Sequence, residues 1–176
     1  MIIRDNYDVN DSLVNGLCIA RTPDGKVLFK KHNMVVNGGR DAILSTMLAE
    51  TKISFTRIAF GNNISMTTRE TTSISGFKHG DEDVYSYNVV DSASGIDDKS
   101  VSTYVVDGEN RSIKFSVPVK ASNPAEICEM GLFFKLTDSG GEDGEENLFS
   151  RVVFDPIFCG PNAAVSSFTI DYVVYL

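Results

Sequence analysis

Short apolar stretches alternate with polar, glycine-containing turns along most of the chain. Within several stretches the apolar residues recur at every second position, which is typical of a strand with one buried face. Two of the turns, TPDG at 22–25 and DGEN at 107–110, contain the residue types that tight turns favour. The pattern predicts strands at 14–20, 26–31, 54–60, 84–90, 101–106, 113–117, 127–136, 148–154 and 168–175.

One segment has the period of a helix instead. Residues 39–50 carry Ile43, Leu44, Met47 and Leu48 on one helical face, so we predict a single short helix there. Residues 64–80 are rich in Ser and Thr and contain few apolar side chains. The pattern assigns no regular structure to that long segment.

Many short strands, regular turns and one helix indicate a mostly β protein, and we predict an antiparallel β-sandwich of the jelly-roll kind. Residues 127–136 are mostly apolar, which is typical of a strand covered on both faces. No internal repeat and no linker composition interrupts the chain. We therefore expect residues 16–176 to form one domain, preceded by an N-terminal arm at 1–15.

Composition limits the classes of partner. Hydrophobic residues make up 42% and charged residues 23% of the 176 residues, as in ordinary globular proteins. The net charge of −8 argues against nucleic acid, because phosphate binding requires a basic surface. No apolar run approaches the roughly 20 residues of a membrane-spanning helix, and the N-terminus lacks a signal-peptide pattern. We expect a protein that is made inside the cell and contacts neither nucleic acid nor membrane.

Three cysteines, Cys18, Cys128 and Cys159, lie far apart and each falls in an apolar stretch. Free cysteine in such a stretch behaves as a small buried hydrophobic residue, which is the interpretation we favour. One disulfide or a bridge between subunits is the alternative.

The sequence contains no recognisable catalytic, cofactor-binding or metal-binding motif. His32 adjoins two lysines and His79 lies in the polar segment, and neither has neighbours at metal-ligand spacing. A nucleophile elbow and a phosphate-binding glycine loop are both missing from the chain. We therefore expect no enzymatic activity and no cofactor.

An acidic run, DSGGEDGEE at 138–146, offers oxygen atoms that could bind a cation. Its spacing differs from that of an EF-hand loop, and it falls between two predicted strands. We interpret it as a solvated hairpin loop, with a cation site as the alternative.

Five segments follow one another in a characteristic order: GRDAIL at 39–44, FTRIAFG at 55–61, ICEMGLF at 127–133, LFSRVVF at 148–154 and FTIDYVVY at 168–175. Taken in this order, they resemble segments of a family of bacteriophage tail, tail-fibre and neck-associated structural proteins. The resemblance covers roughly residues 34–176 and leaves 1–33 without a counterpart. The acidic loop is also longer than the family's usual connection.

Two residues in these segments carry opposite charge on neighbouring predicted strands. We predict that Glu129 and Arg151 form a structural ion pair across those strands, with a ligand site as the alternative. Exchanging the two side chains should restore most of the stability that either single change removes. Gly131 is expected to allow close backbone approach or to form a bulge.

The resemblance implies a non-enzymatic structural protein of a virion tail, baseplate or neck (collar), assembled in the cytoplasm of the host bacterium. The expected partners are other virion proteins and further copies of the chain, as a trimer or ring. The expected assembly contacts are the scattered apolar residues of the arm, Ile2, Ile3, Tyr7 and Val9.

Two other functions remain open at this point. The first is a receptor-binding or carbohydrate-binding module of a tail fibre, whose loops would touch the host surface. The absence of Trp weakens the case for a sugar-stacking site. The second is an enzyme that degrades the cell wall, for which the sequence has no motif.

Overall fold

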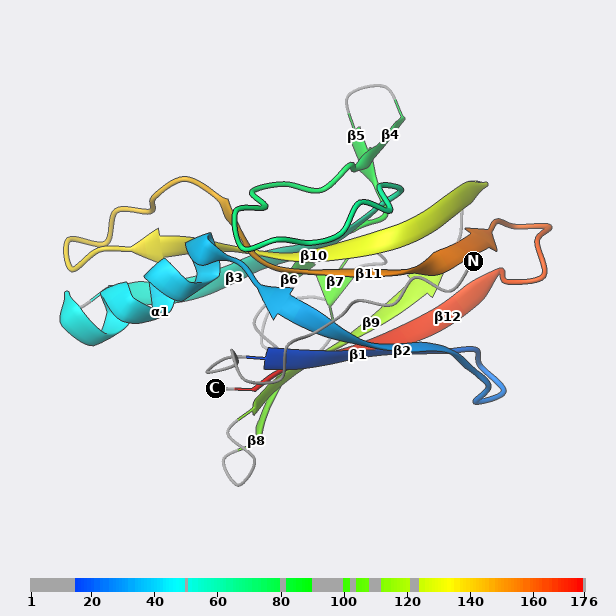
Figure 1. Cartoon of the computed structure of the whole chain (residues 1–176), viewed down its shortest axis with the longest axis horizontal. Helices are drawn as coiled ribbons and strands as arrows, with labels where there is room; N and C mark the ends of the chain where they lie inside the picture. The colour runs from blue at the N-terminus through cyan, green and yellow to red at the C-terminus, as the bar shows by residue number, and fades with distance from the viewer. Residues whose placement is uncertain are drawn as a thin grey trace.

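The structure is a computed structural model that describes residues 15–49, 51–79, 82–89, 100–101, 104–107, 112–120 and 124–175. These residues form a mostly β fold with one helix, α1 (Asn37–Leu48), which confirms the predicted class (Figure 1). The strands are β1 (Asn15–Arg21), β2 (Val27–Val35), β3 (Lys52–Gly61), β4 (Phe77–His79), β5 (Glu82–Val84), β6 (Ser86–Val89), β7 (Ser100–Val101), β8 (Tyr104–Asp107), β9 (Ser112–Lys120), β10 (Ala125–Thr137), β11 (Asn147–Cys159) and β12 (Ser167–Tyr175).

One continuous sheet contains most of the strands, in the order β7-β6-β3-β10-β11-β2-β1-β12-β9-β8. Its neighbouring strands are antiparallel except for β6 and β7, and β4 and β5 form a separate small hairpin. In Figure 1 the sheet forms two layers, with β3, β10 and β11 in one and β1, β2, β12 and β9 in the other.

The two layers join at β11 and β2, which share only the residue pairs Ser150–Val35 and Arg151–Met34. Beyond these pairs, the stacked rings of Phe29 and Phe154 lie 4.1 Å apart and fill the space between the strands. At the other side of the sheet β7 approaches β9. The curled sheet is therefore an architecture between a two-layer sandwich and a nearly closed barrel.

Helix α1 begins two residues before the predicted start at residue 39, and of the four residues on the predicted apolar face only Ile43 packs against the core. Gly39 and Ala42 are its buried residues, whereas Leu44, Met47 and Leu48 are 54%, 75% and 84% exposed. A Cβ atom on Gly39 would lie 2.3 Å from the carbonyl oxygen of Phe149. The helix lies so close to β11 that only small side chains fit between them.

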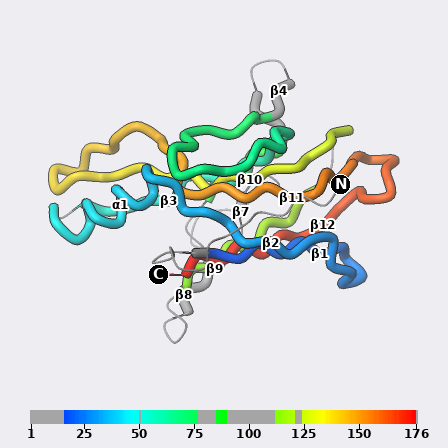
Figure 2. The backbone as a smooth tube through the Cα atoms, in the orientation of Figure 1, coloured from blue at the N-terminus to red at the C-terminus, as the bar shows by residue number. Residues whose placement is uncertain are grey.

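Strand β10 is covered on both faces, as its sequence predicts. Met130, Leu132 and Phe134 belong to the main core between the layers. The outer face is covered by the irregular segment 62–75, which follows β3 and crosses over β10 and β11 (Figure 2). We call this segment the 62–75 loop. Its residues from 64 onward fall within the region to which the sequence pattern assigned no regular structure.

The acidic run at 138–146 is an exposed hairpin loop between β10 and β11, as expected. A carboxylate oxygen of Asp138 accepts hydrogen bonds from the amides of Gly140 and Glu142. The carboxylate of Glu146 accepts hydrogen bonds from Thr56 (2.6 Å) and Arg57 (2.7 Å). Several of its acidic side chains therefore hold the loop in place.

All three cysteines are buried and free, which confirms the interpretation of them as core residues. Burial raises the pKa of the Cys18 thiol well above its usual value and that of Cys128 to about 11. Burial also raises the pKa of Cys159. In the part of the chain that the structure describes, no helix has the length and apolar character needed to cross a membrane.

Candidate functional site

The outer face of β3, β10 and β11 brings together three of the segments that carry the family resemblance. These strands are neighbours in the sheet. In the β10–β11 ladder, Glu129 lies opposite Val153 and Gly131 lies opposite Arg151. Because side chains two residues apart on a strand point to the same face, Glu129 and Arg151 meet diagonally on this outer face.

The structure brings the predicted pair into direct contact. The Nε atom of Arg151 donates a hydrogen bond of 2.7 Å to Oε2 of Glu129. The side chains are only 2% and 0% exposed, respectively. A buried charge is costly unless it is paired and hydrogen-bonded, so the surroundings of this pair determine its role.

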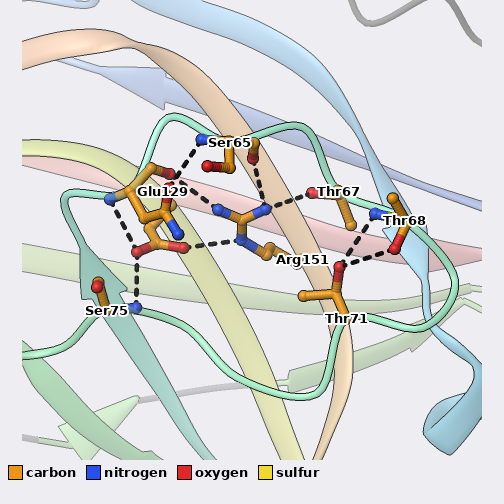
Figure 3. Close-up of polar contacts among 8 residues, drawn as sticks. Ser65, Thr67, Thr68, Thr71, Ser75, Glu129 and Arg151 are labelled. Atoms are coloured by element: carbon orange, nitrogen blue, oxygen red, sulfur yellow. Dashed lines mark hydrogen bonds and ion pairs between the residues drawn. The ribbon is translucent and has the colours of Figure 1, made fainter.

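Arg151 is surrounded by hydrogen-bond acceptors from the 62–75 loop (Figure 3). Its Nη1 atom donates to the backbone carbonyl of Ser65 at 2.8 Å and to the hydroxyl of Thr67 at 3.1 Å. Its Nη2 atom donates to the carbonyl of Asn63 at 2.8 Å. The guanidinium group therefore holds the first part of the loop through two backbone carbonyls and one side chain.

Glu129 holds both ends of the same loop. Its Oε1 atom accepts hydrogen bonds from the backbone amides of Asn63 at 3.0 Å and Ser75 at 2.8 Å. These residues are twelve positions apart in the sequence, near the beginning and the end of the loop. One carboxylate oxygen therefore closes the loop, while the other binds Arg151.

The polarity of the loop backbone is matched to each charge. Amide groups point toward the carboxylate of Glu129, and carbonyl groups point toward the guanidinium of Arg151. Exchanging the two residues would place a carboxylate against carbonyl oxygens and a guanidinium against amide hydrogens. The expectation that a charge exchange restores stability therefore does not fit this geometry, because the pair is not isolated.

Two glycines of the resembling segments make room for this arrangement. A Cβ atom on Gly61 would lie 2.0 Å from the carbonyl oxygen of Ser75 and 2.4 Å from Oε1 of Glu129. A Cβ atom on Gly131 would lie 2.8 Å from the side chain of Leu148 and 3.0 Å from that of Ile74.

The expectation for Gly131 is wrong in its detail. Side chains approach it rather than backbone, and the register shifts of β10 fall between Ile127 and Glu129, between Leu132 and Phe133 and between Phe133 and Phe134.

Apolar contacts and a further hydrogen bond fix the rest of the loop. Ile74 packs on a small cluster of buried residues on the outer face, which consists of Val36, Ala59, Phe133 and Leu148. The carbonyl of Arg69 accepts a hydrogen bond of 2.8 Å from the amide of Asn37, the first residue of α1. The loop is thus bound to β10, to β11 and to the start of the helix.

The chemistry of this site is that of an anchor. Glu129 receives three hydrogen bonds and Arg151 donates four, all within the protein. Both side chains hydrogen-bond to the backbone of the 62–75 loop and so hold it in place. Sequence reasoning found the pair but missed the loop contacts, which join residues far apart in the chain and have no local motif.

The structure describes the side chain of only one of the two histidines singled out in the sequence. His32 is exposed, and its Nδ1 atom lies 3.2 Å from the carbonyl oxygen of Gly16. The side chain of His79 and the arm residues Ile2, Ile3, Tyr7 and Val9 lie outside the described residues. Within the described ranges, no group of three or more His, Cys, Asp or Glu side chains is arranged to hold a metal ion.

A second surface feature was not predicted. The exposed side chains of Leu44, Met47 and Leu48 lie three and four residues apart, so they form one apolar stripe on the helix, here called the α1 stripe. Leu48 follows the buried Gly39 by nine residues, about two and a half turns, and so lies on the opposite side of the helix. The stripe faces away from the sheet on which α1 packs.

Comparisons of the chain with protein-family models, with curated proteins and with solved structures gave no significant match, so the residues themselves carry any assignment of function.

Proposed function

We propose that this chain is a non-enzymatic structural protein of a bacteriophage particle. It acts in the tail, baseplate or neck through contacts with other virion proteins and with further copies of itself, as a trimer or ring. It is assembled into the virion in the cytoplasm of the host bacterium.

The observation that carries this proposal is the α1 stripe. Single exposed apolar residues are common on protein surfaces, but a group on one helical face resembles the anchor positions of helical interfaces. Leu44, Met47 and Leu48 are each more than half exposed. A protein that works inside an assembly would bury such a stripe against a neighbour.

The anchored loop supports the same proposal. Segments resembling those of phage structural proteins supply Gly61, Glu129 and Arg151, which together hold the 62–75 loop. A loop tied down by buried charges has a defined shape and can serve as a fixed surface for neighbours. In this account the resembling segments specify a rigid scaffold.

The test is the composition of purified particles. Phage particles are purified on a density gradient from cells that produce a phage encoding this chain, and their proteins are quantified by mass spectrometry. We expect the chain at a fixed ratio to the major tail protein, and antibody label at the tail, baseplate or neck. Recovery of the chain only in the fraction free of particles would contradict the proposal.

A receptor-binding module is the second candidate, and one observation favours it. Ile64 and Met66, in the anchored loop, are 45% and 63% exposed. They alternate in sequence with Asn63 and Ser65, whose backbone carbonyls accept hydrogen bonds from Arg151. Both exposed side chains are therefore held on a rigid scaffold. Purified chain in excess should then block phage adsorption to host cells, whereas the structural role predicts unchanged adsorption.

A further inference from the structure

The α1 stripe is too small to form a stable interface by itself. Specific interfaces use roughly 20–30 residues on each side, and the stripe supplies three large side chains. A slender apolar segment that lies along the helix fits this surface better than a second broad face.

The chain itself contains such a segment. Residues 1–14, which lie outside the described part, include the apolar residues Ile2, Ile3, Tyr7 and Val9. They precede Asn15, the first residue of β1, which lies opposite Met34 near the end of β2. Since β1 and β2 are antiparallel, β1 begins at the end of the sheet where β2 continues into α1.

The length of the segment allows it to reach a neighbouring copy. Fourteen extended residues span about 45 Å. Helix α1, with 12 residues, is about 18 Å long. A domain of this size is about 40 Å across, so an arm can extend from one copy to the helix of the next.

The direction of the stripe favours a neighbour over the same chain. The arm starts at the sheet, whereas Leu44 and Leu48 lie on the side of α1 turned away from the sheet. An arm of the same chain must pass around the helix to cover them. An arm from an adjacent copy can approach them from the open side of the helix without that detour.

We infer that the α1 stripe of one copy binds the N-terminal segment 1–14 of a neighbouring copy. This inference rests on the proposed assembly function and names the partner for that surface. The contact joins two different surfaces, so repeating it generates a ring or a stack of copies.

The test uses full-length chains with matched lysine substitutions. The arm variant is Ile3→Lys with Tyr7→Lys, and the stripe variant is Met47→Lys with Leu48→Lys. The control is Phe158→Lys, which changes a 62% exposed apolar residue on β11. Sedimentation velocity measures association. We expect wild type and control to associate alike, and each double variant to associate at least tenfold more weakly.

An equimolar mixture of the arm and stripe variants distinguishes this contact from non-specific association. Each mixed pair retains one intact arm and one intact stripe, so we expect one-to-one pairs and no larger species. Full association of either variant alone, no pairs in the mixture, or a monomeric wild type would overturn the inference. Docking within one chain would also overturn the inference. It would appear as a Met47 methyl resonance that differs between the arm variant and wild type when both are diluted until they are monomeric.

The two proposals can fail separately. If the chain associates through arm and stripe but is missing from phage particles, the virion assignment fails and the proposed contact stands. If the chain is present in particles but the mixed variants form no pairs, the proposed contact fails and the virion assignment stands.

Discussion

The charges of Glu129 and Arg151 are fixed in position by loop backbone of the opposite polarity. Removing one partner of a buried pair typically costs about 3–5 kcal/mol, because the other charge is left without compensation. We therefore expect Glu129→Ala and Arg151→Ala each to lower the free energy of unfolding by about that amount. The exchanged double variant, Glu129→Arg with Arg151→Glu, should be no more stable than the single variants. Urea denaturation measures all three.

A surface pair provides the control for this measurement. Arg21 donates a hydrogen bond of 3.0 Å to Asp171, and its side chain is 39% exposed. Exposed pairs contribute less than about 1 kcal/mol, so Arg21→Ala should have a small effect. If the exchanged variant regains most of the lost stability, the loop contacts contribute little and the pair acts alone.

Gly61 and Gly76 offer a matched comparison at the two ends of the loop. They form a bridge with each other, but a Cβ atom on Gly61 would overlap the carbonyl of Ser75, whereas one on Gly76 would meet no atom within 4 Å. We expect Gly61→Ala to cost about 1–3 kcal/mol, as overpacking does, and Gly76→Ala to change stability by less than about 0.5 kcal/mol. Equal effects in thermal denaturation would show that the close approach at Gly61 is unimportant.

The buried cysteines should be chemically inert in the folded protein. The thiolate is the reactive form, and a pKa of about 11 leaves about one Cys128 in a thousand ionised at pH 8. Burial raises the pKa of Cys18 and Cys159 as well. A thiol reagent at pH 8 should therefore react slowly with native protein and rapidly with three thiols in urea. Fast reaction of a native thiol would place that cysteine outside the core.

At the scale of elements, the 62–75 loop should behave as part of the fold. Arg151→Lys keeps the charge but removes the forked geometry that holds Asn63 and Ser65. We expect the amides of Asn63 and Ser75 to exchange hydrogen at least tenfold faster in this variant.

The amides of Gly140 and Glu142, which are hydrogen-bonded to Asp138 in the acidic loop, serve as the control for that exchange measurement. They should be unchanged in Arg151→Lys. Uniform acceleration at both loops would indicate general loosening of the domain instead of release of the 62–75 loop.

Local patterns were enough to predict most strands and the existence of the helix. The continuous apolar character of 127–136 predicted that β10 is covered on both faces, and the structure confirms this. The covering element could not be identified, because its contacts join residues such as Asn63 and Arg151 that are 88 positions apart. The spacing of apolar residues shows which face of a strand is buried, but it does not show which segment covers that face.

The helix illustrates the same limit. Its period correctly groups Leu44, Met47 and Leu48 on one face, yet Gly39 and Ala42 form the face that packs on the sheet. The backbone of Phe149 leaves no space for larger side chains at that contact. A pattern of apolar residues alone therefore could not show that the larger residues remain exposed.

At the scale of the whole molecule, different parts of the chain have different tasks. The curled sheet provides the scaffold, and the buried pair fixes a loop on its outer face. Helix α1 presents an apolar stripe at the end of the sheet where β1 begins. The mostly β class of the scaffold could be predicted from sequence, whereas its curled sheet and the exposure of the stripe required the structure.

An electron cryomicroscopy map of the assembled phage particle tests the central claim most directly. We expect repeated copies of this fold in the tail, baseplate or neck, with Leu44, Met47 and Leu48 of each copy covered by a neighbouring copy. A particle map without this fold, or one in which the α1 stripe faces solvent in every copy, would contradict it.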